Sequence, residues 1–155
     1  MEKTEIESVL AKCDLFSGLD ASFIKEIADY CTVKEYRPGQ TVFTQGDFGE
    51  SLYIIAEGQV FVERTMDLGD RKGKVLIGIL GKKRAFGCWS ALLGQPHDLM
   101  ASATCHRKTT LISFKGSEMR GLMIELSELG FEILQKLCII LRGRIRSAYG
   151  AMEKL

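Results

Sequence analysis

The sequence lacks the features that mark several classes of protein. None of its five cysteines forms a CxxC pair, so it signals neither a zinc site nor an iron–sulfur cluster. The first 14 residues are charged throughout and contain no apolar core of a signal peptide. The longest apolar runs, at 75–80 and 137–141, are far too short to cross a bilayer. These absences predict a cytoplasmic protein without membrane association, whose thiols are reduced and mostly buried.

Catalytic motifs are also missing. Ser51, Ser90 and Ser102 have no G-x-S-x-G context, and neither a P-loop nor a dinucleotide fingerprint occurs. The two histidines, His97 and His106, do not have the spacing of metal ligands. We therefore expect no enzymatic activity, no metal and no resident cofactor, and keep an enzyme or a haem-bound sensor as the least supported hypothesis.

The charge of the chain is nearly balanced but unevenly distributed. Residues 1–80 carry 9 Lys or Arg against 14 Asp or Glu, whereas residues 81–155 carry 12 against 6, for a net charge of +1. A net charge near zero argues against non-specific nucleic-acid binding by this chain. The basic half either meets an acidic ligand or partner, or forms solvated helix faces.

The order of elements predicts one α+β domain over residues 1–155. Residues 1–30 have helical periodicity, and residues 116–155 return to it. Between them, residues 31–115 contain short β-prone segments separated by turns centred on glycine, including the hairpin signal Glu57-Gly58. Short strands at near-regular spacing favour a mainly β, antiparallel β-roll or jelly roll, with N-terminal helices and a long C-terminal helix.

The C-terminal helix is predicted to run from Ser127, placed as its cap, to about Met152. It presents one apolar seam, whose partner is either the protein's own roll or the same helix of a second subunit. The seam consists of Leu134, Leu137, Leu141, Ile145 and Ala148. The basic residues Lys136, Arg142, Arg144 and Arg146 lie largely off the seam, which predicts a basic outer face.

The segment YRPGQTVFTQGDFGESLYIIAEGQVFVE, at 36–63, carries a specific resemblance to a known family. Together with LFSGL at 15–19, it resembles the cyclic-nucleotide-binding domain of the catabolite-activator and protein-kinase-A regulatory families. The resemblance covers roughly residues 14–146. It implies that residues 84–105 form the phosphate-binding cassette, in which backbone N–H groups near a short helix face the cyclic phosphate.

The resemblance also implies which residues line the ligand site. These are Phe86, Gly87, Cys88, Trp89, Ser90, Ala91, Met100, Ala101, Ser102 and Ala103, with the Ser102 hydroxyl and the amides near Ala91 as the main phosphate donors. Two charged anchors of the family are replaced. Cys88-Trp89 stands where the family has a Glu, and Met100 or Ala101 stands where it has an Arg. Losing both anchors predicts roughly 10²–10⁴-fold weaker binding of cAMP or cGMP.

Three side chains of the cassette have two interpretations each. Trp89 either stacks on a purine or anchors the core. His97, helped by the cluster 82–84, either replaces the missing cation or is an exposed loop histidine. Cys88 is either a reactive thiol or an ordinary buried one, and no base beside it marks activation.

We therefore expect a bacterial regulatory domain that senses a cyclic nucleotide or another small anionic ligand and passes the signal through its long helix. We expect a homodimer through this helix, with no nucleic-acid binding by this chain alone. The alternative is a degenerate domain that binds no ligand and acts as a module for dimerisation or protein interaction.

Overall fold

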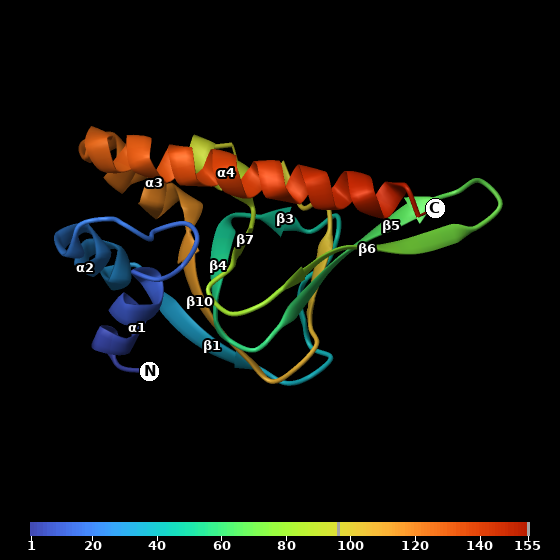
Figure 1. The fold of residues 1–155 in the computed structure, drawn as a ribbon, viewed down its shortest axis with the longest axis horizontal. Coiled ribbons are helices and arrows are strands. Elements are labelled where there is room, and N and C mark those ends of the chain that lie inside the picture. The colour runs from blue at the N-terminus through green and yellow to red at the C-terminus, as the bar shows by residue number, and fades with distance from the viewer. Residues whose placement is uncertain (96, 155) are drawn as a thin grey trace.

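A computed structural model describes residues 1–95 and 97–154 of the chain. Helices lie at both ends of the sequence and strands lie between them (Figure 1). One short 3₁₀ helix, η1, interrupts the strands. The helices are α1 (Lys3–Leu10), α2 (Ala21–Asp29), η1 (Trp89–Leu93), α3 (Gly116–Glu125) and α4 (Ser127–Met152).

The strands form antiparallel sheets, which confirms the predicted fold class. They are β1 (Thr32–Tyr36), β2 (Thr41–Phe43), β3 (Phe48–Gly49), β4 (Ser51–Glu57), β5 (Val60–Asp67), β6 (Lys72–Leu80), β7 (Ala85–Gly87), β8 (His97–Asp98), β9 (Ser102–Cys105) and β10 (Thr109–Lys115). One four-stranded sheet has the order β1-β10-β4-β7, and the other has the order β2-β9-β5-β6. Strands β3 and β8 form a small third sheet. The predicted tight turn at Gly58 connects β4 to β5, and its φ of +103° requires glycine.

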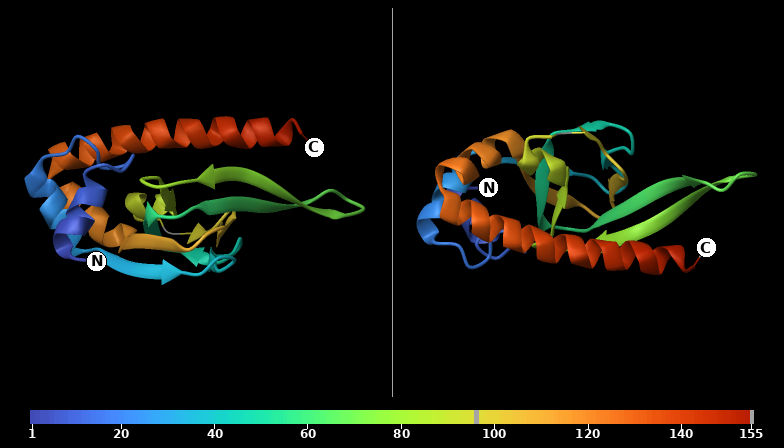
Figure 2. Two further views of the ribbon diagram at one scale, coloured as in Figure 1. Left: turned by 60° about the horizontal axis from the view of Figure 1, so that its bottom comes forward. Right: turned by 90° about the horizontal axis from the view of Figure 1, so that it is seen from above.

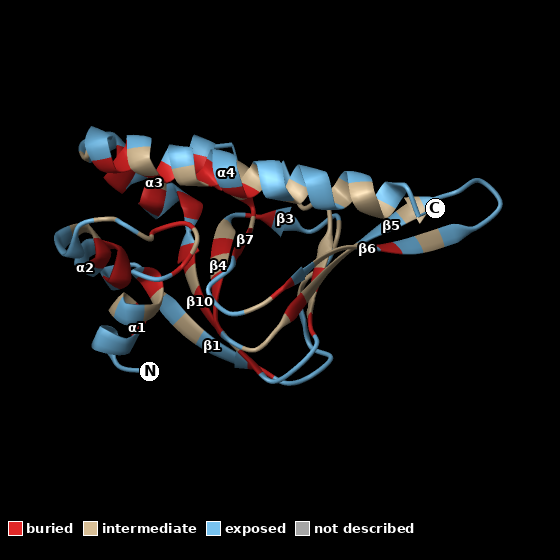
Figure 3. Cartoon of the chain, viewed as in Figure 1, coloured by how far each residue is buried: buried red, intermediate tan, exposed pale blue. Residues whose placement is uncertain are grey.

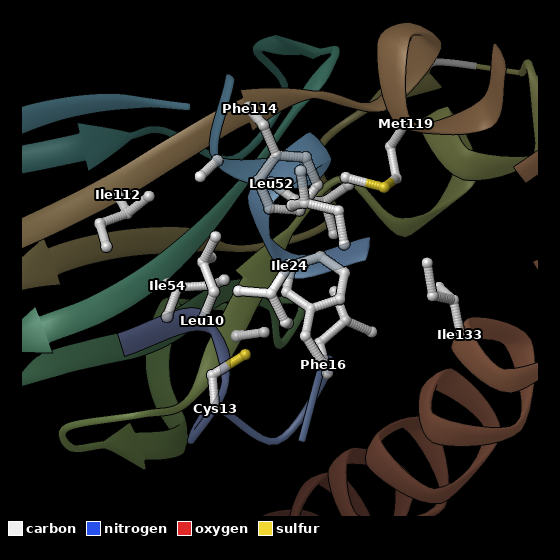
Figure 4. Close-up of a cluster of buried hydrophobic side chains, with 14 of the residues drawn as sticks. Leu10, Cys13, Phe16, Ile24, Leu52, Ile54, Ile112, Phe114, Met119 and Ile133 are labelled. Atoms are coloured by element: carbon white, nitrogen blue, oxygen red, sulfur yellow. The ribbon is translucent and has the colours of Figure 1, made fainter. Parts of the chain in front are cut away.

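The core has two parts. Helices α1 to α4 and the inner face of the first sheet enclose the larger part, where the rings of Phe16 and Phe114 lie 5.6 Å apart (Figure 4). The smaller part fills the roll between the sheets and includes Tyr36, Ile55 and Phe86. Burial therefore concentrates where the helices meet the sheet, while the outer end of the β5–β6 hairpin is largely exposed (Figure 3).

Helix α4 packs along its length on the rest of its own chain. Its residues Ile133, Leu137 and Ile140 are buried in the larger core, and its C-terminal half lies beside β6 (Figure 2). The predicted bounds of this helix are confirmed, but Ser127 is its first residue, and the N-cap position belongs to Leu126. Among the described residues, none of the helices is both long and apolar enough to cross a membrane.

Helix η1 is positioned by a close approach to α3. A Cβ atom at Gly116 would overlap the Cβ atom of Ala91 and lie 2.8 Å from its carbonyl carbon. Glycine at the start of α3 therefore lets the cassette helix pack directly on the C-terminal helices.

We predict that Gly116→Ala destabilises the protein by about 1–3 kcal/mol, because the added methyl overpacks the contact with η1. The double variant with Ala91→Gly should recover part of that loss. Gly121→Ala is the matched control, since a Cβ at Gly121 meets nothing within 4 Å, and it should stabilise α3 by about 0.5–1 kcal/mol. Urea unfolding of the four proteins measures these differences, and equal effects of the two alanine variants would contradict the prediction.

Candidate functional site

A cavity of about 310 Å³ lies between β7, η1, the second sheet and α4. Seven of the ten sequence-predicted ligand residues line it: Phe86, Gly87, Cys88, Trp89, Ser90, Met100 and Ala101. The lining also includes nine residues outside that set of ten, among them His97, which the sequence offered as a replacement for the missing cation. These are Phe43, Val62, Ile77, His97 and Leu99 from the roll and cassette, and Leu141, Arg144, Ile145 and Ala148 from α4.

The other three predicted residues lie outside the cavity lining. Ala91 packs under Gly116, and Ala103 is fully buried between β2 and β5. The Ser102 hydroxyl accepts a hydrogen bond of 2.8 Å from the backbone N–H of Gln45. Whether Ser102 and the Ala91 amide serve a phosphate stays a prediction.

The base of the cavity is set by β7, which pairs with β4. The Phe86 ring stacks on Tyr53 at 5.3 Å and lies 6.0 Å from Phe43. Gly87 has a φ of +125°, and a Cβ there would lie 2.6 Å from the carbonyl oxygen of Ser51. The Phe-Gly pair of the cassette therefore combines an aromatic wall with a backbone conformation, at the end of β7, that only glycine adopts without strain.

A serine–histidine pair stands on the cavity wall. The Ser90 Oγ lies 2.7 Å from His97 Nε2, and His97 Nδ1 lies 2.7 Å from the carbonyl oxygen of Asp98. A carbonyl only accepts, so Nδ1 carries a proton and, in neutral His97, the Ser90 hydroxyl donates to Nε2. Both polar groups are thus already hydrogen-bonded to the protein.

The basic cluster expected beside His97 is engaged elsewhere. Lys82 pairs with Glu57, and Arg84 pairs with Asp14, at 3.3 Å between Nε and Oδ2. None of residues 82–84 is part of the cavity lining. Their expected help to His97 is therefore wrong in this structure, because salt bridges to Glu57 and Asp14 hold two of the three.

The cation at the cavity comes from α4 instead. Arg144 lines the cavity, and its Nη2 donates a 2.6 Å hydrogen bond to the carbonyl oxygen of Ala85, the first residue of β7. The prediction that this arginine belongs to a basic outer face is wrong. The signal was in the sequence, since Arg144 follows Leu137 by two helical turns and so shares its inward face.

Asp14 also binds the backbone of Ala85, as Arg144 does. Its Oδ1 accepts a 2.8 Å hydrogen bond from the Ala85 N–H, so Asp14 and Arg144 hold the two polar groups of one edge-strand residue. The Arg84 side chain is close to Oδ2, but among the described residues Oδ2 is buried without a hydrogen bond of acceptable geometry. Burial raises the pKa of Asp14, against the effects of the Ala85 N–H and of both arginines.

Burial and, to a smaller extent, the nearby Arg84 charge lower the pKa of the Arg144 guanidinium to about 10, against the opposing effect of Asp14. At neutral pH Arg144 is still charged, and part of its hydration has been removed. A partly dehydrated cation attracts an anion more strongly than one in water. The cavity therefore has a positive charge from α4, whereas the described cassette residues that line it include no lysine or arginine.

The residues of the predicted helical seam lie in two different environments in the structure. Leu137 is buried in the core, while Leu141 and Ala148 line the cavity, so these residues meet the protein's own roll. Leu134 is exposed, and Ile145 is both 51% exposed and part of the cavity wall. Their role in a dimer stays a prediction.

The described residues contain no group of three or more His, Cys, Asp or Glu side chains that could hold a metal ion. The pKa of the Cys13 thiol is raised to about 12 by burial, and that of Cys31 likewise. These thiols are protonated at neutral pH.

The sequence and the fold of this chain are both similar to those of known proteins. Residues 33–125 match the family model of the cyclic nucleotide-binding domain. The CRP-like cAMP-activated global transcriptional regulator of Mycobacterium tuberculosis is 27% identical over 137 residues, which are 88% of this chain and 59% of the regulator. The chain thus spans less than two thirds of that relative.

Two solved structures are similar to this chain. A cyclic nucleotide-binding domain from Methylobacillus flagellatus has a TM-score of 0.80 at 21% identity, covering 99% of this chain and 84% of that one. The catabolite activator protein of Thermus thermophilus has a TM-score of 0.68 at 28% identity, covering 90% of this chain and 62% of its own. The first likeness shows the shared fold, and the second also shows sequence similarity.

We predict that Asp14 makes the stability of the protein fall as pH rises. A carboxyl group whose pKa is raised by folding ionises more easily in the unfolded chain, so its ionisation favours unfolding. Its contribution is most favourable below the ordinary carboxyl pKa and is lost as pH rises through the folded-state value. Asp14→Asn keeps the Oδ1 acceptor and removes this dependence.

Urea unfolding of both proteins at several pH values between about 3.5 and 7 tests this prediction. The stability of the wild type relative to Asp14→Asn should decrease across that range. A relative stability that increases with pH would show that the Arg84 and Arg144 charges outweigh burial.

Proposed function

The chain belongs to the cyclic nucleotide-binding domain family, and we propose that it is a regulatory domain whose ligand enters the cavity between cassette and α4. The ligand's presence is then passed on as a change in the packing of α4. The observation that carries this proposal is the shared wall of the cavity. Four of its residues belong to α4, and four belong to β7 and η1, with Cys88 between these two elements.

The cavity has the properties of a small-molecule site. Its volume lies at the lower end of the range of about 300–1,000 Å³ that is typical for ligand pockets. Its wall is mostly apolar, with few polar groups, as such sites commonly are. Because one side of it is a helix and the other a cassette, a ligand in contact with both has a different affinity for open and closed arrangements.

The relatives support a regulatory role. The mycobacterial relative is named as a cAMP-activated transcriptional regulator, and a relative in Mycosarcoma maydis is a regulatory subunit of cAMP-dependent protein kinase. We propose the same class of role, with a changed ligand preference. Among the described residues the cavity wall contains neither the carboxylate nor the cassette arginine, and Met100 or Ala101 stands at the second position.

A second candidate function rests on the exposed side of α4. Phe131, Cys138, Ile145 and Met152 recur every seven residues and are all exposed, with Tyr149 between the last two. A seven-residue apolar repeat is the pattern of a helix that pairs with another helix. The exposed stripe therefore favours a second copy of α4 as partner, along a face that is rotated from the predicted seam.

Both functions share Ile145, which belongs to the cavity wall and to the exposed stripe. A ligand that moves this residue changes the surface offered to a second helix. Sensing and dimerisation are therefore compatible within one mechanism, and dimerisation without a ligand is the alternative.

We predict that the correct ligand raises the melting temperature. At 100 times its dissociation constant a ligand adds about 2.7 kcal/mol, which corresponds to roughly 5–10 °C for a chain of this size. Thermal unfolding with millimolar cAMP, cGMP and a panel of small anions measures the shift. An Ala101→Trp variant, which fills the cavity, should abolish it, and a shift that survives in that variant would place the ligand elsewhere.

We also predict that Tyr149→Glu weakens self-association at least about tenfold, because an unpaired carboxylate in an apolar interface costs more than about 1.4 kcal/mol. Ile139→Glu is the matched control, since Ile139 is equally apolar and 57% exposed but lies off the stripe. Sedimentation equilibrium measures both. A wild-type monomer, or equal loss in both variants, would remove the stripe as the interface.

A further inference from the structure

Among residues 1–95 and 97–154, the cavity wall contains one permanently charged side chain, that of Arg144. Its other lining residues are apolar or small, apart from Ser90 and His97, which hydrogen-bond to each other. We infer that Arg144 binds the anionic group of the ligand, and that the ligand is an organic anion with an apolar body, such as an acyl or aryl carboxylate. This inference rests on the proposed function.

The guanidinium of Arg144 is both positioned and available. In the described part of the chain its recorded hydrogen bond is the one from Nη2 to the Ala85 carbonyl, so four of its five N–H donors are not used by the protein. That bond restricts the position of the Arg144 side chain on α4 before a ligand binds. A planar guanidinium with free donors matches the two oxygens of a carboxylate or sulfonate.

The rest of the wall favours an apolar body over a sugar. Nine of the lining residues have large apolar side chains, from Phe43, Val62, Ile77, Phe86, Trp89, Leu99, Met100, Leu141 and Ile145. The lining holds no carboxylate that could accept hydrogen bonds from ribose hydroxyls. Burying hydroxyl groups among these side chains without partners would cost more than burying methylene groups.

Another arginine near the cassette is a rival for the anion. Arg64, on β5, donates to the carbonyl oxygen of Met100. Arg64 is exposed and is not part of the cavity lining, whereas Arg144 is partly buried and is. Partial burial makes the Arg144 charge the stronger one for a ligand inside the cavity.

The position of Arg144 also links binding to α4. The same side chain joins the helix to β7 through Ala85 and faces the ligand, so the anion contacts helix and cassette through one group. A neutral molecule of the same shape fills the cavity without that contact. The charge of the ligand, and not only its shape, then determines how firmly α4 is held.

The test compares the binding of octanoate with that of octan-1-ol to the full chain by isothermal titration calorimetry, which needs no reporter ligand of its own. We expect octanoate to bind Arg144→Gln roughly 10- to 100-fold more weakly than the wild type, and octan-1-ol to bind both equally. Arg142→Gln and Arg64→Gln remove the same charge at exposed positions and should change octanoate binding by less than about 2-fold. Near-ultraviolet circular dichroism establishes that each variant is folded, and Arg144→Lys tests charge with altered geometry if Arg144→Gln is not.

The outcomes separate this inference from the proposed function. Loss of octanoate binding in Arg144→Gln alone supports the inference. Equal losses in all three variants, or a loss only in Arg64→Gln, would overturn it and leave the sensing role intact. A wild type that ignores octanoate but is stabilised by a nucleotide, with that shift abolished by Ala101→Trp, would also overturn the ligand class while supporting the proposed function. If no anion or nucleotide binds, both fail.

Discussion

The packing of α4 on its own roll is the contact on which the rest of the structure depends. Ile133, Leu137 and Ile140 bury one face of this helix in the larger core. Full burial of a large aliphatic side chain stabilises the folded state by about 1.5–3 kcal/mol. Burial of these three residues therefore contributes more to the position of the helix than any one of its hydrogen bonds. Once the helix lies there, its next inward-facing residues close the fourth side of the cavity, and Arg144 reaches Ala85.

Two glycines hold the framework of the candidate site in place. The close approach of Gly116 to Ala91 positions η1, and the positive φ of Gly87 lets the end of β7 pack closely on β4. A cation at the cavity wall is supplied by α4, through Arg144. In the function proposed above, its interaction with a ligand depends directly on where the helix lies.

Much of the fold could be predicted from local patterns. The bounds of α4, the turn at Gly58 and the antiparallel roll follow from apolar periodicity and from glycine turns, which act over a few residues. Seven cavity residues of the cassette were also predicted, because the resemblance runs along a contiguous segment. The cavity residues on β2, β5, β6 and α4 were not predicted as ligand residues. A local sequence pattern does not indicate which distant segments of the chain line the same cavity.

The sequence by itself determined the class of fold, and it predicted the place of the cassette and the absence of two charged side chains from it. Only the tertiary structure decided which residues of distant segments join the cassette at the cavity. The sequence left two possible partners for the seam of α4. In the structure the helix is oriented so that Leu141 and Ala148 line the cavity, while Phe131 and Tyr149 are exposed. The orientation of α4 depends on the packing of the whole core, which joins residues far apart in the sequence. It places Arg144, expected on the outer face, in the wall of the cavity.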